Sequence, residues 1–260
     1  MGYIDFTFNG TSARDMRIKS VRVEEDIMQF PFITSADETT VKLPYSNETY
    51  LSKYSRENLS IDLQLMKTDE LGNPKIWTTE DIGEVAGWLV TEKYKPLILG
   101  DKTHIIYYAY LSNSDKLQHY ANGGILPITF QTNSPYGWSI PEMEQYSFTT
   151  NGSRNITLVN KSNVTDYHRP IVEIKNINAG GVVKLTNITT GDKTVELKGL
   201  YANETISMDN ERELIYSDKP LTKFAGRFNY NWLRLRRGTN TIRVDGACHI
   251  VVRNKLLIVG

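Results

Sequence analysis

The chain has 260 residues, of which 40% are hydrophobic and 23% charged, so its composition is that of an ordinary folded protein. Lys plus Arg and Asp plus Glu both number 30, and the formal net charge is zero. This balance argues against a nucleic acid partner, because neutralising phosphates needs a surplus of basic residues. No run approaches the roughly 18 apolar residues of a membrane span, so we expect no membrane partner either.

The length favours two domains of ordinary size over one. The single cysteine, Cys248, excludes an internal disulfide and a cysteine-based metal site. The first residues, MGYIDFTFNG, lack the basic and apolar segments of a secretory signal, so we expect the protein to fold without export.

Apolar and polar residues alternate in the first half of the chain, which predicts half-buried strands at residues 5–8, 16–23 and 59–65. The intervening residues 24–58 contain two prolines and five scattered aromatic residues. Because long loops in compact domains are usually functional, we interpret this stretch as an extended hairpin or arm that packs on a neighbouring molecule. A hairpin packed on its own domain is the alternative.

One helix is predicted after residue 77. Thr78 or Thr79 caps it, and the acidic Glu80 and Asp81 suit its positive end. The spacing of apolar residues predicts a single buried face made of Ile82, Val85, Ala86 and Leu89. Strands are again expected at residues 97–99, 105–111 and 125–130.

The segment Pro135-Tyr136-Gly137-Trp138 interrupts this pattern. Pro135 should end the preceding strand and Gly137 should permit a turn. Tyr136 and Trp138 are then expected to bury their rings at a joint between two domains. We therefore predict domains at residues 1–137 and 138–260.

Short strands separated by turn residues recur through the second half, as in a β-sandwich. They are expected at residues 155–159, 171–177, 182–187, 193–197, 205–208, 214–217, 232–235, 240–244 and 249–252.

Catalytic and metal-binding patterns are missing from the sequence. The four histidines share no metal-ligand spacing, there is no Gly-x-Ser-x-Gly motif, and the paired glycines lack the context of a phosphate loop. The adjacent carboxylates at residues 24–26 are typical of a solvated turn. We expect no catalytic residue, no metal and no cofactor.

Sugar binding is a separate possibility for the second half. Asn231, Trp232 and Arg234 lie close together, and an exposed tryptophan can stack on a pyranose ring while its neighbours bond the hydroxyls. The alternative assigns Trp232, Leu233 and Leu235 to a core strand with Arg234 and Arg236 facing solvent, because apolar and basic residues alternate there.

Taken in order, these features resemble the distal tail proteins of long-tailed, non-contractile bacteriophages and prophages. The resemblance spans nearly the whole chain, from Phe6-Thr7-Phe8-Asn9-Gly10 through Gly87-Trp88-Leu89, Tyr94-Lys95-Pro96-Leu97, Ile106-Tyr107-Tyr108-Ala109 and Ser134-Pro135-Tyr136-Gly137 to Arg169-Pro170-Ile171 and Arg237-Gly238-Thr239-Asn240. Arg237 stands where that family usually has a proline.

The resemblance implies a mainly β fold, with a ring-forming N-terminal domain that carries one α-helix and a galectin-like C-terminal β-sandwich. It implies a structural virion protein that is assembled in the host cytoplasm and forms a ring, generally hexameric, at the tail tip. Its expected partners are further copies of itself, the tail tube protein, the tail-tip protein and receptor-binding proteins. A carbohydrate-binding module that contacts the host cell wall is the alternative function.

Overall fold

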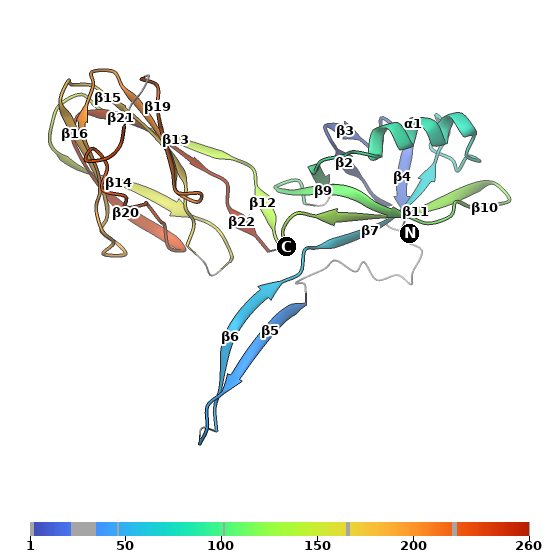
Figure 1. Cartoon of the computed structure of the whole chain (residues 1–260). Coiled ribbons are helices and arrows are strands. Elements are labelled where there is room, and N and C mark those ends of the chain that lie inside the picture. Colours follow the sequence, from blue (N-terminus) through green and yellow to red (C-terminus); the bar gives the residue numbers. More distant parts are fainter. Residues whose placement is uncertain are drawn as a thin grey trace. The chain divides into compact units, whose positions relative to one another are not determined.

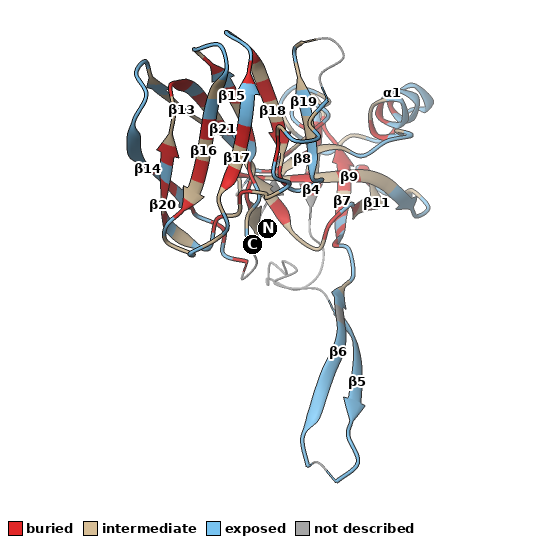
Figure 2. Ribbon diagram, turned by 60° about the vertical axis from the view of Figure 1, so that its left-hand side comes forward, coloured by how far each residue is buried: buried red, intermediate tan, exposed pale blue. Residues whose placement is uncertain are grey.

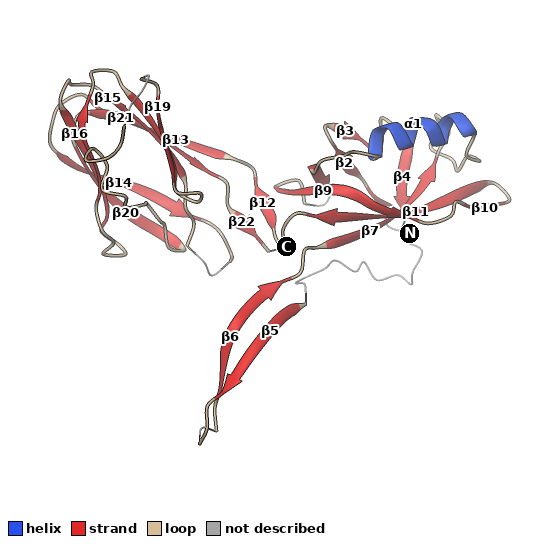
Figure 3. Cartoon of the chain, in the orientation of Figure 1, coloured by secondary structure: helices blue, strands red, loops and turns tan. Residues whose placement is uncertain are grey.

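The computed structural model describes residues 3–21, 35–45, 47–100, 102–164, 167–219 and 223–259 (Figure 1). The chain divides into two compact units: unit 1 is Met1–Trp138 with Val259–Gly260, and unit 2 is Ser139–Ile258. Strands dominate both units, and α1 (Thr79–Leu89) is the only α-helix in the described residues (Figure 3). The prediction of a mainly β fold with one helix is therefore confirmed.

Unit 1 is built on one large antiparallel sheet. Its strands follow the order β1-β4-β7-β11-β9-β8-β2-β3, and β10 pairs with β11. Their bounds are β1 (Tyr3–Ile4), β2 (Phe6–Phe8), β3 (Thr11–Ser12), β4 (Ile18–Val21), β7 (Ser60–Lys67), β8 (Lys95–Leu99), β9 (Ile105–Ser114), β10 (Gln118–Tyr120) and β11 (Gly123–Thr132).

The connection between β1 and β2 shapes this sheet. The two strands lie near opposite ends of the strand order, yet only Asp5 separates them in sequence. Because two peptide units span at most about 7 Å, the sheet must curl until its ends approach each other. The aromatic rings of Phe6 and Phe8 pack on Phe130 inside the curl, with centroids 6.3 and 5.0 Å away.

Helix α1 begins as the sequence predicts. Thr78 is the N-cap and forms a capping box with Asp81. The predicted buried face is wrong at two positions, because Ile82 is 44% exposed and Ala86 is also exposed. The buried face consists of Asp81, Val85 and Leu89. The first turn of the helix therefore buries the carboxylate of Asp81, whereas the apolar pattern predicted that it would bury Ile82.

A buried cluster of charges explains why Asp81 is buried. The Lys67 side chain is 4% exposed, and its Nζ lies 3.3 Å from both the Asp81 and the Glu84 carboxylates. Burial opposes ionisation of Asp81, but hydrogen bonds from the Thr78 backbone N–H and from Lys75 outweigh it and hold the pKa below the ordinary 3.8. The helix is thus bound to β7 through charge as well as through its apolar face.

Unit 2 is a sandwich of two antiparallel sheets, with orders β13-β21-β15-β18-β19 and β14-β20-β16-β17. Its bounds are β13 (Glu142–Phe148), β14 (Ser153–Asn160), β15 (Ile171–Asn176), β16 (Gly181–Asn187), β17 (Val195–Leu200), β18 (Thr205–Asp209), β19 (Leu214–Ser217), β20 (Gly238–Asp245) and β21 (Cys248–Asn254). One apolar core fills the space between the sheets, and Figure 2 shows buried residues alternating along the strands. The strand predicted at residues 232–235 is wrong, since only an isolated bridge between Leu235 and His168 forms there.

A buried ion pair stabilises one end of the sandwich. The fully buried Glu204 carboxylate accepts hydrogen bonds from Arg227 at 2.6 Å, from the Ser217 hydroxyl at 2.7 Å and from the Tyr201 backbone N–H at 2.8 Å. Burial opposes its ionisation, but these bonds, led by that of Arg227, lower the pKa of Glu204. One carboxylate therefore connects β19 and two irregular segments.

We expect Asp81→Asn to lower the free energy of unfolding at pH 7 by about 2–4 kcal/mol, because it weakens the capping box and leaves Lys67 buried beside one exposed carboxylate. The folded-state pKa of Asp81 is depressed, so its contribution is present above the unfolded value and is lost as pH falls. Urea unfolding should therefore show the difference from wild type shrinking below about pH 4. An equal loss from the exposed Asp115→Asn control would contradict this.

Candidate functional site

The described part of the predicted arm is a two-stranded hairpin. Strands β5 (Ala36–Lys42) and β6 (Thr49–Arg56) pair with each other and with no other described strand. Every described side chain from residue 35 to residue 53 is exposed, and Figure 2 shows the hairpin as exposed along its length. The hairpin prediction is thus confirmed for these residues, whereas residues 22–34 and 46 lie outside the described ones.

Large apolar side chains gather in the half of the hairpin that contains its turn. Their exposed fractions run from 45% to 108%, and they are Val41, Leu43, Tyr45, Tyr50 and Leu51. Tyr45 is the most exposed of them at 108%, and its φ of 67° places it in the left-handed region. That conformation is costly for a bulky residue, so the turn presents Tyr45 to solvent at the expense of backbone strain.

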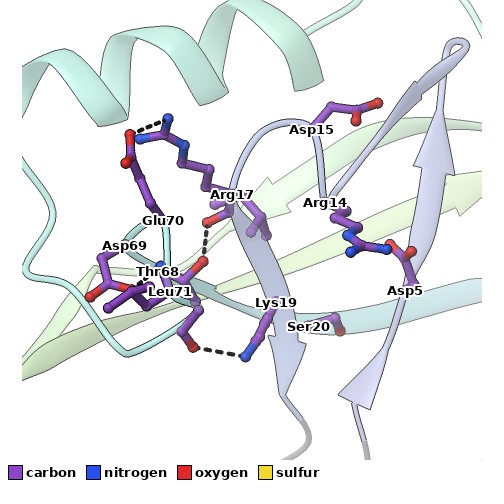
Figure 4. A pocket seen from close by; sticks show the side chains of 12 residues that line it. Asp5, Arg14, Asp15, Arg17, Lys19, Ser20, Thr68, Asp69, Glu70 and Leu71 are labelled. Carbon is purple, nitrogen blue, oxygen red and sulfur yellow. Dashed lines mark hydrogen bonds and ion pairs between the residues drawn. The ribbon is translucent and has the colours of Figure 1, made fainter.

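A charged crevice of about 690 Å³ lies in unit 1 beside β4, between Asp5 and the residues that follow β7 (Figure 4). Asp5, residues 14, 15 and 17–20, and residues 68–72 line it. Its walls carry three basic and four acidic side chains. A cavity of this size is comparable to the pockets that hold ligands in proteins.

Two contacts join the crevice walls. Arg17 pairs with Glu70 at 2.9 Å, and the Lys19 ammonium donates to the Gly72 carbonyl at 2.8 Å. Arg17 has a φ of 52°, and its carbonyl accepts hydrogen bonds from both the N–H and the hydroxyl of Thr68. The wall therefore contains a residue that is held in a strained conformation by its neighbours.

Other polar groups of the crevice have no partner. The Ser20 hydroxyl is buried, its residue being 1% exposed, and it makes no hydrogen bond with any residue that the structure describes. Among the described side chains, the guanidinium of Arg14 and the carboxylates of Asp5 and Asp15 form no ion pair. Buried polar groups in native proteins are nearly always paired, so the Ser20 hydroxyl is an exception, whereas Arg14, Asp5 and Asp15 are exposed to solvent.

The predicted joint segment has a different local basis from the one expected. Gly137 lies in β12 (Gly137–Ser139) and does not have a positive φ. A Cβ at this residue would lie 2.2 Å from Ile105 Cγ2, so glycine is required by close packing and not by a turn. Just after this segment, the Ser139 N–H donates to the Leu256 carbonyl at 2.7 Å, a contact within unit 2. The joint role of Pro135, Tyr136, Gly137 and Trp138 stays a prediction.

The side chains proposed for sugar contact interact mainly within unit 2. The Asn231 amide donates to the Thr194 carbonyl at 2.8 Å, and the Trp232 ring packs edge-on against Phe228, 5.0 Å between centroids. Arg234 forms three hydrogen bonds with the Asp192 carboxylate and lies 4.4 Å over the Tyr167 ring. These contacts occupy the groups that would bind a sugar, and the sugar prediction stays untested.

No arrangement typical of catalysis is found in the parts of the chain that the structure describes. No group of three His, Cys, Asp or Glu residues among them is placed to hold a metal ion. Cys248 is buried in the sandwich core, and burial raises the pKa of its thiol to about 11, which makes it a poor nucleophile. No described helix is long and apolar enough to cross a membrane.

Family models establish what kind of protein this is. Residues 1–134 match a model described as a phage tail protein N-terminal domain, and residues 136–253 match one described as a phage tail C-terminal domain. Since the two matches cover most of the chain, the chain belongs to this family of phage tail proteins.

Comparisons with individual proteins give three further similarities. The SPbeta prophage-derived uncharacterized protein YomH of Bacillus subtilis (strain 168) is 26% identical over 249 residues, 94% of each chain. The crystal structure of Dit from phage SPP1 matches with a TM-score of 0.69 and 12% identity, over 98% of this chain and 99% of that one. A chain of the phage P2 baseplate covers 97% of both with a TM-score of 0.46 and 9% identity. The predicted resemblance to distal tail proteins is confirmed at the level of the fold.

We expect Trp232→Ala to lower the free energy of unfolding of unit 2 by about 2 kcal/mol, because the half-buried indole packs on the sandwich core. Urea unfolding measures this loss. Tyr230→Ala is the control, since its ring contacts the same Phe228 but is 61% exposed, and its effect should be smaller. Wild-type binding on a glycan array that disappears in Trp232→Ala without loss of stability would instead establish a sugar platform.

The joint prediction is tested by limited proteolysis. If Tyr136 and Trp138 bury their rings between domains, replacing both with Ala should speed cleavage near the exposed Ile140 severalfold, because the domains then reorient more freely. Circular dichroism should show that each fold persists. Unchanged cleavage would contradict a joint at this segment.

Proposed function

We propose that this tail protein forms a closed ring, with six subunits, at the distal end of a non-contractile phage tail. The ring joins the tail tube protein to the tail-tip protein and to receptor-binding proteins. The exposed hairpin is the observation that carries this proposal, and the fold shared with SPP1 Dit, a protein described as a paradigm of hub adsorption apparatus, supports it.

The hairpin requires a partner for energetic reasons. A two-stranded hairpin is at best marginally stable in water, because it has no second layer on which to bury its side chains. Here five large apolar side chains are uncovered in its outer half, and both of its edges lack a described partner strand. Burying those side chains against a neighbouring subunit would contribute roughly 25 cal/mol for each Å² of apolar surface removed from water.

The geometry of the contact favours a ring. A hairpin that packs on a different surface of the next subunit makes a heterologous contact, which repeats from subunit to subunit and closes when the rotation allows. The remainder of the chain is consistent with a structural role, because membership in a family of tail proteins and the two well-packed units both favour a scaffold.

Removing the hairpin should abolish the ring and leave a folded monomer. The Glu57 N–H donates to the Ser35 carbonyl at 3.2 Å, so the two ends are adjacent and residues 36–56 can be replaced by Gly-Gly. Light scattering after gel filtration should give a multiple of 29.7 kDa for wild type and roughly one chain for the deletion.

Two controls make this result interpretable. Circular dichroism must show that the deletion variant keeps its strands, and Tyr216→Ser, which removes a 58% exposed tyrosine of unit 2, should leave the assembly unchanged. A wild-type protein that is monomeric at every concentration, with no ring in negative-stain images, would overturn the proposal. A misfolded deletion variant would favour a hairpin that packs on its own unit.

A further inference from the structure

We propose that the charged crevice of one molecule receives the hairpin turn of a second copy, with Tyr45 entering the crevice and Lys42 facing Asp15 and Asp5. The inference rests on the proposed ring and deepens it, because it names both halves of the contact between subunits. The acceptor site is thus completed by residues of the neighbouring molecule.

The hairpin and the crevice that would receive a neighbour's hairpin lie at opposite ends of β7. The hairpin ends at Arg56, three residues before β7 begins at Ser60, whereas Thr68 on the crevice wall directly follows the last residue of β7. Eight residues of strand separate the two by about 26 Å. One molecule can therefore give its hairpin at one end and accept another at the other end, as a head-to-tail contact requires.

The crevice has unsatisfied groups that a second molecule would satisfy. The buried Ser20 hydroxyl has no partner, and Figure 4 shows Ser20 on the crevice wall near Arg14 and Asp5. Because the Ser20 oxygen is buried, a tyrosine hydroxyl would reach it only after neighbouring crevice side chains move aside, whereas the tyrosine ring can lie directly against the exposed guanidinium of Arg14. The strained Arg17 is a further sign of a binding function at this wall.

Charge complementarity selects the hairpin turn as the occupant. Acidic side chains outnumber basic ones in the crevice, and the exposed Asp5 and Asp15 are unpaired among the described groups. The turn carries the exposed Lys42 three residues before Tyr45, and Tyr45 is the most exposed large apolar residue described. A cation and an aromatic ring on one turn thus match the carboxylates and the unpaired hydroxyl of the crevice.

Cysteine cross-linking tests the contact directly. Cys248 is the only native cysteine and is buried, so introduced cysteines should react with a short bismaleimide before it does. Chains carrying Tyr45→Cys are mixed with chains carrying Asp15→Cys, and we expect a covalent dimer only in the mixture. Tyr216→Cys in place of Tyr45→Cys is the control and should give none.

The double variant, with Tyr45→Cys and Asp15→Cys in one chain, separates docking between molecules from docking within one. We expect a ladder of covalent oligomers up to the size of the ring. A cross-linked monomer would mean that the hairpin folds back on its own crevice, and it would overturn the proposal.

Charge reversal provides an independent measurement. We expect Lys42→Glu and Asp15→Lys each to weaken self-association at least tenfold, and the two together to restore it. Ser20→Ala should weaken assembly without lowering the stability of the monomer. Rings of wild-type size with no cross-link and no effect of charge would overturn the docking contact and leave the ring standing, whereas a protein that never assembles would overturn both.

Discussion

The connection through Asp5 is the constraint on which unit 1 depends. One residue links strands near opposite ends of the strand order, so the sheet must curl, and the curl gives Phe6, Phe8 and Phe130 a common interior. The crevice lies beside this connection and is lined by Asp5, by residues of β4 and of the segment before it, and by the residues that follow β7.

Some buried polar side chains and some apolar side chains of this protein are matched within the chain, and others are not. Each unit contains a buried carboxylate that is matched by cations and hydrogen bonds, Asp81 with Lys67 and Glu204 with Arg227. The hairpin instead leaves its apolar side chains in water, and the crevice leaves a buried hydroxyl unpaired. Uncovered apolar side chains of this kind favour assembly with a partner, which agrees with membership in a family of phage tail proteins.

Much of the fold could be predicted because strands and caps are local patterns. The alternation of residues located most strands, and the Thr78 capping box marked the start of the helix. The errors arose where distant residues intervened. Asp81 takes a buried position because Lys67, on another element, supplies its charge, and Gly137 is required by the proximity of Ile105. Neither neighbour is visible in the local sequence.

The sequence by itself determined a mainly β chain with one capped helix, a candidate arm and a resemblance to distal tail proteins, because periodicity, capping residues and ordered motifs are properties of neighbouring residues. It did not reveal the crevice. Asp5, Arg14, Ser20 and Asp69 come from three separate segments of the chain, and only the tertiary structure brings them together. Tertiary structure also decided that the arm is uncovered, since exposure depends on what packs against a strand and not on the strand itself.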